Sequence, residues 1–180
     1  FKEKNPDKSV IILEKSLRLL SKVKISGGGR CNITNAVSDP KKLSEFYPRG
    51  GKELIGAFNR FTSSDTIQWF EARGIKLKNE PDNRIFPVTD TSQTIIDCFL
   101  NEASRLEIKI FTGKNADKFE PFNNQWEITT SDNSKFISDK ILIAPGGSEH
   151  IWQILAAFGH KIIEPVPSLF TLNIKDKRIK

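Results

Sequence analysis

Residues 26–35, with the sequence SGGGRCNITN, carry the groups of this chain that are best suited to binding a flat, charged ligand. Three successive glycines can adopt positive φ and turn their N–H groups toward an anion, and the missing Cβ atoms let a ring approach the main chain. Arg30 can pair with a phosphate, and Asn32 offers neutral donors and acceptors. These residues indicate a nucleotide- or flavin-binding loop, with a structural turn as the alternative.

Glu14 is a second candidate, because it closes the short apolar run SVIILE at residues 9–14. Such a run is typical of a parallel strand buried on both faces. In a dinucleotide-binding βαβ unit the acid that ends the second strand accepts hydrogen bonds from the ribose hydroxyls. The glycine fingerprint of such a unit lies about 20 residues before that acid, so we expect it to precede Phe1. The alternative for Glu14 is an acid that only ends a strand at a surface turn.

The cysteines and histidines offer little further chemistry. Cys31 and Cys98 are too few for a disulfide framework or a cysteine-bound zinc ion, and we predict no metal site. Cys31 could exchange electrons with a neighbouring flavin, but an isolated cysteine more often has a packing role. His150 and His160 are ten positions apart, which favours surface positions at the ends of a helix. The sequence identifies no catalytic acid, base or nucleophile.

The elements that must position these residues alternate between helix and strand. Apolar runs predict buried strands at residues 9–14 and 140–144, and a polar turn predicts a hairpin that joins residues 75–78 and 84–88. Three extended segments between residues 108 and 136 predict an antiparallel meander. Periodicity and capping residues predict helices at residues 39–47, 53–61, 91–106 and 150–158, and one capped by Ser64 or Asp65 that ends at Arg73. The fold class is therefore α/β with a β-meander at about 108–138.

Length, composition and charge limit the classes of function. The chain has 180 residues, 37% hydrophobic and 28% charged, which excludes a disordered tail. No apolar run approaches the roughly 20 residues of a membrane-spanning helix, so we expect no membrane partner and a cytoplasmic location. The net charge of +6 favours anionic ligands, but the basic residues are scattered singly. This scatter favours an ordinary solvated surface over a nucleic-acid partner. A basic nucleic-acid-binding domain or a non-catalytic interaction domain remains the alternative function.

Several blocks, in order, resemble a known family. SVIILEKS, KVKISGGGRCNITN, NRIFPVTD, KILIAPGGS and GHKIIEPVPSLF are similar to the signature blocks of bacterial NAD(P)/FAD-dependent oxidoreductases with aminoacetone-oxidase-like and bile-acid-reductase-like members. Members of that family are about twice as long as this chain. The absence of methionine and the start at Phe1 also suggest a piece of a longer protein.

The resemblance implies a fold, a cofactor and an activity. The fold would be a partial FAD/NAD(P)-binding Rossmann-like three-layer domain over residues 1–160, with a β-rich inserted domain starting at 161–180. The activity would be a flavoprotein oxidoreductase that moves electrons or hydride between NAD(P)H and an unidentified small molecule. In such enzymes the flavin, rather than the protein, performs the electron transfer. We therefore expect this piece to be inactive alone.

The resemblance also carries over to individual residues. It implies that Glu14 binds the adenosine ribose and that the other FAD contacts are Gly28, Gly29, Arg30, Cys31, Asn32, Gly146 and Gly147. Two positions depart from the family pattern. Asn83 stands where a glycine is usual, and Pro145 replaces a threonine, which removes a backbone donor and a hydroxyl before the second glycine contact.

Overall fold

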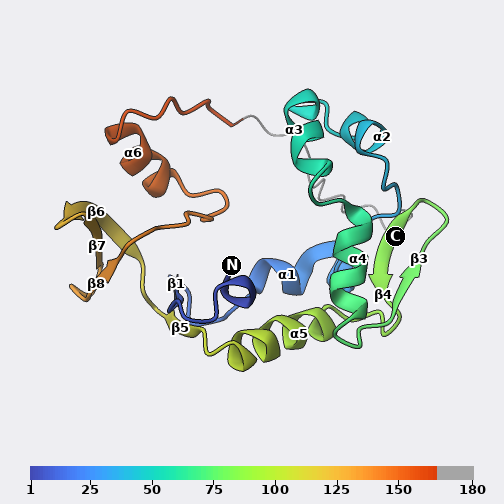
Figure 1. The fold of residues 1–180 in the computed structure, drawn as a ribbon, viewed down its shortest axis with the longest axis horizontal. Helices are drawn as coiled ribbons and strands as arrows, with labels where there is room; N and C mark the ends of the chain where they lie inside the picture. Colours follow the sequence, from blue (N-terminus) through green and yellow to red (C-terminus); the bar gives the residue numbers. More distant parts are fainter. Residues whose placement is uncertain (166–180) are drawn as a thin grey trace, which may run out of the picture. The chain divides into compact units, whose positions relative to one another are not determined.

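The computed structural model describes residues 1–165, which belong to two compact units. Unit 1 comprises Phe1–Lys114, and unit 2 begins at Asn115 (Figure 1). Most of the inserted domain predicted at 161–180 lies outside the described residues. Each unit is therefore described by itself.

Unit 1 contains a parallel pair of strands, β1 (Ile11–Glu14) and β5 (Lys109–Thr112), in which Ile11 lies opposite Lys109. The predicted parallel strand at the start of the chain is confirmed. Its burial on both faces is wrong for the described residues, because Ile11 and Ile12 are 36% and 43% exposed. In the described residues β1 has one neighbouring strand, so it keeps solvent contact that a strand inside a large sheet loses.

A second, antiparallel sheet has the strand order β2-β4-β3, formed by Thr34–Asn35, Arg84–Pro87 and Leu77–Asn79. Leu77 lies opposite Pro87 and Asn79 opposite Ile85, so the predicted hairpin is confirmed. Strand β4 is its most buried element, since Phe86 is fully buried and Ile85 is 4% exposed. The hairpin thus carries an apolar strand at the centre of a small sheet.

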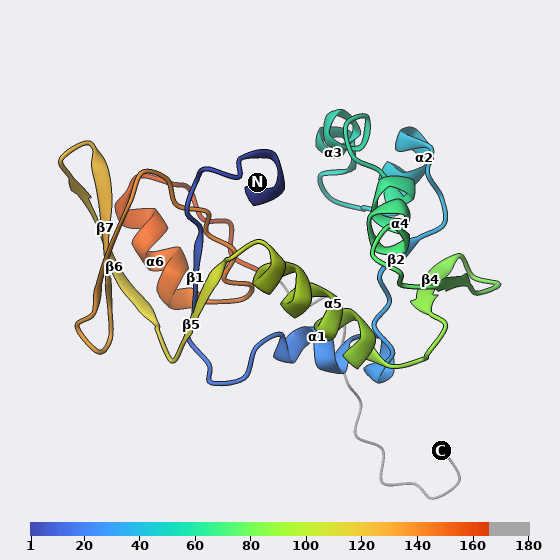
Figure 2. The same ribbon diagram turned by 60° about the horizontal axis from the view of Figure 1, so that its bottom comes forward.

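Five α-helices belong to unit 1, and short 3₁₀ turns lie at Lys2–Lys4 and Ser26–Gly29 (Figure 2). The helices are α1 (Ser21–Ile25), α2 (Pro40–Glu45), α3 (Gly51–Phe58), α4 (Ser63–Glu71) and α5 (Ser92–Arg105). The Asp39 carboxylate accepts a hydrogen bond from the Lys42 N–H at 2.8 Å, as the Asp-Pro pair predicted. Helix α4 differs from its prediction, because Thr62 is the cap.

The cap of α4 is a reciprocal pair of interactions. The Thr62 hydroxyl accepts from the Asp65 N–H, and the Asp65 carboxylate accepts from the Thr62 N–H at 2.6 Å. These hydrogen bonds lower the pKa of Asp65. Asp65 therefore occupies the third helical position of a capping box rather than the cap itself.

The core of unit 1 lies where α4 and α5 meet the second sheet. The buried residues of this cluster are Cys31, Phe70, Ile95 and Cys98. The predicted helix at 91–106 is confirmed, and Thr91 caps it by accepting from the Gln93 N–H. Phe70 also contacts Phe99 edge to face, with ring centroids 5.5 Å apart. Burial of these apolar side chains holds the two helices against the sheet.

An ion-pair network ties the N-terminal turn to the same two helices. Arg73 on the end of α4 pairs with Glu3 and with the Glu102 carboxylate, the latter at 2.9 Å, and its guanidinium lies 3.6 Å from the centre of the Trp69 ring. Arg105 also pairs with Glu102 at 2.8 Å. Hydrogen bonds from Arg105, and then from Arg73, lower the pKa of Glu102 to about 2.

Unit 2 is a three-stranded antiparallel meander of β6 (Ala116–Phe122), β7 (Gln125–Thr130) and β8 (Lys135–Ser138), followed by α6 (Glu149–Ala157). Asn123 and Asn124 both have positive φ, as a tight turn between right-twisted strands requires. The meander is confirmed with a correction: residues 109–112 pair with β1, and β8 supplies the third strand. The α6 prediction is also confirmed.

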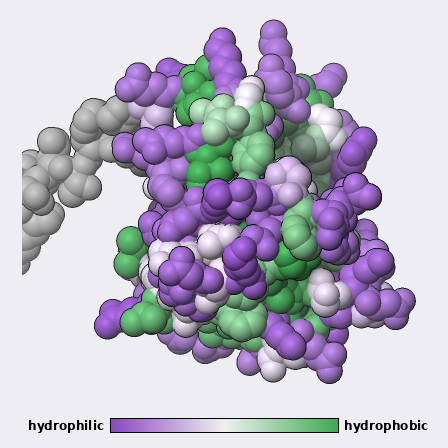
Figure 3. Space-filling view, turned by 90° about the vertical axis from the view of Figure 1, so that its left-hand side faces the viewer, coloured by the Kyte–Doolittle hydropathy of each residue, from purple (hydrophilic) through white to green (hydrophobic). Residues whose placement is uncertain are grey.

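Packing within unit 2 joins its helix to its sheet. Phe119 and Ile128 in the meander and Ile151 on α6 are buried. Trp126 and Phe158 meet edge to face, with ring centroids 5.6 Å apart. On the side of the molecule seen in Figure 3, hydrophobic residues form separate groups among hydrophilic ones.

The strand predicted at residues 140–144 is wrong. The segment has no regular structure, and Leu142 is 93% exposed. An apolar run forms a strand only where another strand offers its main-chain groups, and no such strand pairs with this segment among residues 1–165.

Within residues 1–165, no helix is both long enough and apolar enough to cross a membrane.

Candidate functional site

The glycine loop, residues 26–35, adopts the left-handed backbone conformation that its sequence predicted. Gly27, Gly28 and Gly29 have φ of 55°, 66° and 84°. Cys31, at φ 63°, is also left-handed, which is uncommon for a residue with a side chain. The Cys31 N–H donates to the Ser26 carbonyl at 3.0 Å and closes the loop. The loop is thus a defined turn with its own hydrogen bonds.

Strand β4 packs against the glycine loop through Phe86 and pairs with it through Ile85. A Cβ at Gly27 would lie 2.6 Å from the Asn32 nitrogen and 3.0 Å from the Phe86 ring, so only glycine fits there. The Ile33 N–H donates to the Ile85 carbonyl at 2.8 Å, and β2 continues this pairing. The blocks SGGGRCNITN and NRIFPVTD, about 50 residues apart in the chain, therefore form one structural unit.

Gly28 differs from Gly27 in its surroundings. Nothing lies within 4 Å of the position that a Cβ would take at Gly28, and the residue is exposed. Asn32 is exposed as well, whereas Gly29 is half-buried. The open part of the loop is consequently the main chain at Gly28 together with the Asn32 side chain.

Arg30, predicted to pair with a phosphate, has carboxylate partners within unit 1. Its Nη1 lies 2.6 Å from Glu80 Oε1 and 3.4 Å from Asp90 Oδ1, and its guanidinium lies 4.0 Å from the centre of the Phe86 ring. The hydrogen bond to Glu80 raises the pKa of Arg30. Hydrogen bonding to Lys78, and more weakly to Arg30, lowers the pKa of Asp90. In this arrangement Arg30 joins the loop to the hairpin.

Cys31 is placed in the core, 7% exposed, in the cluster that includes Cys98. Both thiols are free. Burial is the main cause that raises the pKa of Cys98. A protonated, buried thiol is a poor nucleophile, and Cys98 therefore has a packing role in this cluster. Contact between Cys31 and a cofactor, which the resemblance implies, stays a prediction.

Glu14 lies at the carboxyl end of β1, where ligands bind in parallel sheets. Its Oε1 accepts from both the N–H and the hydroxyl of Ser16, each at 2.8 Å. These bonds orient the carboxylate and leave Oε2 without a hydrogen-bond partner among the described residues. No hydrogen bond or ion pair within residues 1–165 joins Glu14 to the glycine loop, so the structure does not bring these two predicted sites into contact.

Gly146 and Gly147 belong to unit 2 and precede α6. Both are exposed, and Gly146 has φ 65°. Pro145 is exposed as well, so it has no place in the apolar core of unit 2. On the first turn of α6, His150 Nε2 lies 3.3 Å from Asp117 Oδ1, a pairing that no sequence spacing indicated. The histidine is nevertheless at a helix end, as predicted.

The backbone conformation of Asn83 explains why asparagine can stand where the family usually has glycine. Its φ is 65°, a conformation that glycine adopts freely and that asparagine tolerates better than most residues. Its carbonyl accepts from the Ala36 N–H at 2.8 Å, which links the hairpin turn to the end of the glycine loop. Replacing glycine by asparagine there preserves the turn.

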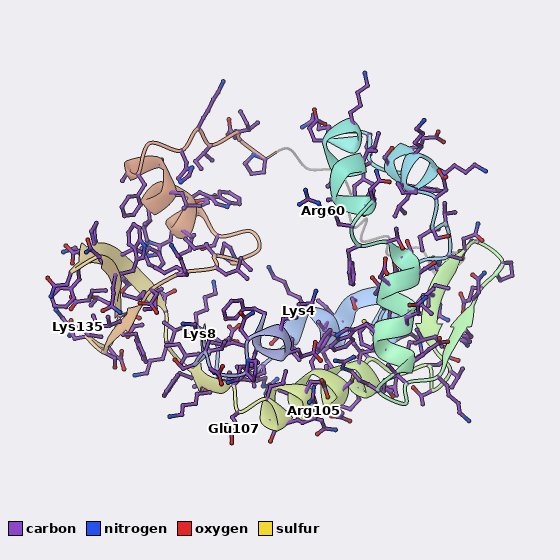
Figure 4. The ribbon with its side chains drawn as sticks, viewed as in Figure 1. Lys4, Lys8, Arg60, Arg105, Glu107 and Lys135 are labelled. Atoms are coloured by element: carbon purple, nitrogen blue, oxygen red, sulfur yellow. The ribbon has the colours of Figure 1, made fainter. Side chains whose placement is uncertain are left out.

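Hollows and metal-binding groups do not single out another site. Two surface hollows of about 670 and 490 Å³ lie near the N-terminal turn and the end of α5, where Figure 4 labels Lys4, Arg105 and Glu107. No residue of the glycine loop lines either hollow. Within residues 1–165, no three His, Cys, Asp or Glu side chains are grouped as metal ligands.

Comparison with known families decides the relationship. The sequence profile described as the HI0933-like protein Rossmann domain matches residues 1–168, nearly the whole chain. The chain belongs to this family. The HI0933-like Rossmann domains are part of the FAD-dependent oxidoreductase superfamily, so the resemblance read from the motifs and the Rossmann-like fold class are confirmed.

Individual relatives of this HI0933-like domain are distant. A 3-dehydro-bile acid delta(4,6)-reductase of Clostridium scindens is 24% identical over 177 residues, which cover 94% of this chain and 42% of the relative. A ribosomal RNA dihydrouridine synthase of Escherichia coli is 26% identical over 170 residues, 94% of this chain and 40% of the relative. The chain therefore spans about two fifths of the length of these relatives. A crystal structure of FqzB covers 77% of this chain and 30% of its own, with 14% identity and a TM-score of 0.37.

Sequence reasoning missed the residues that brace the loop. Glu80 and Lys78 carry no motif, and Asp90 was noticed only as the last residue of the block NRIFPVTD. Their link to Arg30 exists only after the hairpin folds against the loop. The family block that contains Phe86 was noticed, but its place beneath the glycines was not. An acid on each side of an Arg-x-Phe-Pro strand was the one local signal for this contact.

Proposed function

We propose that this chain is the FAD-binding part of a flavoprotein oxidoreductase. Family membership supports the flavoprotein class. Two relatives are named as a bile acid reductase and as a ribosomal RNA dihydrouridine synthase. The observation that carries the proposal is the glycine loop, whose main chain is open at Gly28 and rigidly supported at Gly27. A flat cofactor needs both properties in the same turn.

The residues present fit the adenine dinucleotide in part. Gly28, Gly29 and Asn32 offer an accessible main chain and a neutral amide, and Glu14 has one carboxylate oxygen free of hydrogen bonds among residues 1–165. Arg30 fits less directly, because Glu80 and Asp90 already balance its charge. We therefore assign Arg30 to holding the loop and assign the cofactor contacts to the loop's main chain.

When bound, FAD supplies two-electron chemistry, accepting hydride equivalents from a donor and passing them to an acceptor. The tasks of this chain are to hold the cofactor and to keep the loop in its left-handed conformation. We propose NAD(P)H as the electron donor, a cytoplasmic location and a small molecule as one class of acceptor. Cys31 and Gly146–147 remain candidate cofactor contacts on the resemblance alone.

The proposal is tested by substituting Gly28 and a matched control. Gly28 and Gly74 both have positive φ, at 66° and 78°, and both have nothing within 4 Å of a Cβ position. Either change to alanine costs about 1 kcal/mol of stability through the backbone alone. The flavin absorbance of the purified intact protein then reports binding. We expect Gly28→Ala to lower FAD affinity by roughly tenfold, about 1.4 kcal/mol, because a Cβ there would fill part of the space that the open main chain offers a flat ring.

Gly74→Ala should retain the flavin of the unaltered protein, since Gly74 follows the end of α4, outside residues 26–35, and its Cβ would meet no atom within 4 Å. Equal retention of flavin by both variants would remove the loop from the cofactor site. A colourless unaltered protein that does not take up added FAD would refute the proposed function itself.

A further inference from the structure

Helices α2 and α3 form a hairpin, residues 40–61, that carries aromatic side chains on its surface. Phe46, Tyr47 and Phe61 are 59%, 45% and 55% exposed. A single exposed aromatic residue is ordinary, but three within 22 consecutive residues are a concentration of apolar surface. The Tyr47 ring contacts Phe58 at 5.6 Å between centroids, which orders one edge of this surface.

The same hairpin carries five exposed cations and two acids, so it holds half of the chain's net charge of +6. The cations are Lys41, Lys42, Arg49, Lys52 and Arg60. None of them forms an ion pair with a carboxylate among residues 1–165. Among the other arginines of unit 1, four pair with acids, namely Arg30, Arg73, Arg84 and Arg105, whereas Arg18 forms no ion pair among residues 1–165. The hairpin therefore offers positive charge that unit 1 leaves unbalanced.

The position of the hairpin keeps this surface accessible within unit 1. Helices α2 and α3 lie side by side, at the end of the unit away from β1 and β5 (Figures 1 and 2). No residue of α3 is buried, although Leu54, Ile55 and Phe58 are half-buried against its neighbour. Arg60, labelled in Figure 4, follows the end of this helix. Leu43 and Ser44 on α2 are the buried residues of the pair, and most of its other side chains are in contact with solvent.

We propose that the α2–α3 hairpin binds RNA, with its cations on the phosphates and its aromatic rings stacked on unpaired bases. Cationic grooves with interleaved aromatic side chains are how proteins bind single-stranded nucleic acid. That RNA would be the substrate of the enzyme rests on the proposed function. The bases enter through stacking, so an unpaired loop or end of an RNA is the expected target, and a duplex is not.

The chemistry of the hairpin favours RNA over the other macromolecular partners. An anionic membrane would use an apolar helix face with a cationic border, whereas here the aromatic residues follow the helix ends at 46–47 and 61 and alternate with cations. A protein partner would favour an apolar centre with few lysines. Three flat rings among five unpaired cations match the alternating bases and phosphates of a nucleic acid strand.

The test uses the intact protein and a fluorescein-labelled, uridine-containing single-stranded oligoribonucleotide, with anisotropy measured over a range of KCl concentrations. One variant removes two rings, Phe46→Ala with Phe61→Ala. A second removes two charges, Lys41→Gln with Lys52→Gln. The matched controls are Phe122→Ala, whose ring is 45% exposed on β6, and Lys76→Gln with Lys109→Gln, which are exposed lysines outside the hairpin.

We expect the ring variant to weaken RNA binding by roughly tenfold or more, since each stacked base contributes strongly to affinity. The charge variant should lower the slope of log K against log salt by about 0.7 for each lysine removed. Both controls should bind as the unaltered protein does. The flavin absorbance of every variant should be unchanged.

Three results would overturn the inference. RNA binding that the hairpin variants and the controls alter equally would place the RNA elsewhere. Hairpin-dependent binding to phosphatidylserine vesicles, with no binding to the oligoribonucleotide, would identify a membrane surface. A fall in the unfolding temperature of the ring variant with unchanged RNA affinity would show that other parts of the protein cover the hairpin. A protein without flavin would instead refute the proposed function, so the two failures are distinguishable.

Discussion

Two glycine-rich segments of this chain look alike in sequence and differ in structure. SGGGRCN at residues 26–32 and APGGS at residues 144–148 both match blocks of flavoproteins. The first is closed by the Cys31–Ser26 hydrogen bond, joined to β4 through Ile33 and packed on the buried Phe86. The second follows an apolar run that forms no strand, and its glycines are exposed with nothing near Gly147.

The difference shows that glycines permit a ligand-binding turn but do not create one. Without a Cβ, glycine escapes the steric limit on positive φ, but a single conformation results only when packing and hydrogen bonds select it. At residues 26–35 these come from the β3–β4 hairpin. At residues 144–148 unit 2 provides no comparable support among its described residues. The contrast can be tested by paired substitutions, one at each glycine segment or at an apolar residue that accompanies it.

The largest effect is expected from the apolar residues that accompany the two turns. Phe86→Ala removes a fully buried ring beneath Gly27 and Arg30 and should cost about 3–5 kcal/mol of unfolding free energy. Leu142→Ala removes a side chain that is 93% exposed and should cost less than about 0.5 kcal/mol. Denaturant unfolding of the intact protein measures both. Similar costs would show that residues 140–144 are packed in the intact protein, and the contrast would be lost.

An intermediate effect is expected from the glycines themselves. Gly27→Ala places a Cβ 2.6 Å from the Asn32 nitrogen at φ 55° and should cost about 1–3 kcal/mol of stability. Gly147→Ala meets no atom within 4 Å and has no positive φ, so its effect should stay within about 0.5 kcal/mol. Thermal unfolding of the two variants side by side provides the measurement. An unaffected Gly27→Ala would mean that the loop is as loosely held as the second segment.

The smallest effect concerns acid pH. Hydrogen bonds to Lys78 and Arg30 lower the pKa of Asp90. The contribution of Asp90 to folding stability is therefore complete at a pH above its ordinary pKa of 3.8, and it is lost as the pH falls through the lowered pKa. Asp90→Asn should imitate this loss at neutral pH. We expect exchange of the Cys31 amide hydrogen to rise by a factor on the order of two, since exposed ion pairs are weak.

Amide hydrogen exchange of the intact protein provides the comparison, with Asp82→Asn as the matched control. Asp82 pairs with Arg84 at 2.7 Å and has no contact with Arg30, so its removal should leave the Cys31 amide unchanged. If Asp82→Asn accelerates exchange as much as Asp90→Asn does, the Arg30 contact has no particular role in holding the loop.

Several elements could be predicted because their signals are local. The α5 helix follows from apolar residues at helical spacing, and the β3–β4 hairpin from a polar turn between apolar runs. The cap of α4 was misplaced because Thr62, Ser64 and Asp65 are all good caps by type. Only the reciprocal Thr62–Asp65 hydrogen bonds, which depend on the first turn as a whole, distinguish them.

Strand pairing was less predictable, because it depends on contacts between distant segments. Residues 109–112 were grouped with the meander that follows, yet they pair with β1, about 100 residues earlier. Apolar character alone likewise predicted a strand at 140–144, where no partner strand is present among residues 1–165. The five cations of the α2–α3 hairpin looked scattered in sequence because 19 positions separate Lys41 from Arg60. Two adjacent helices gather them.

The amino-acid sequence by itself determined which residues can adopt unusual backbone conformations, which segments have helical or extended periodicity, and to which family the chain belongs. These properties depend on residue type and short spacing, which every part of an unfolded chain already has. Tertiary structure decided that Phe86 supports the glycine loop, that Glu80 and Asp90 neutralise Arg30, and that Cys31 enters the core. Such contacts join residues about 40 or more positions apart, and their energies exist only once the intervening chain has folded.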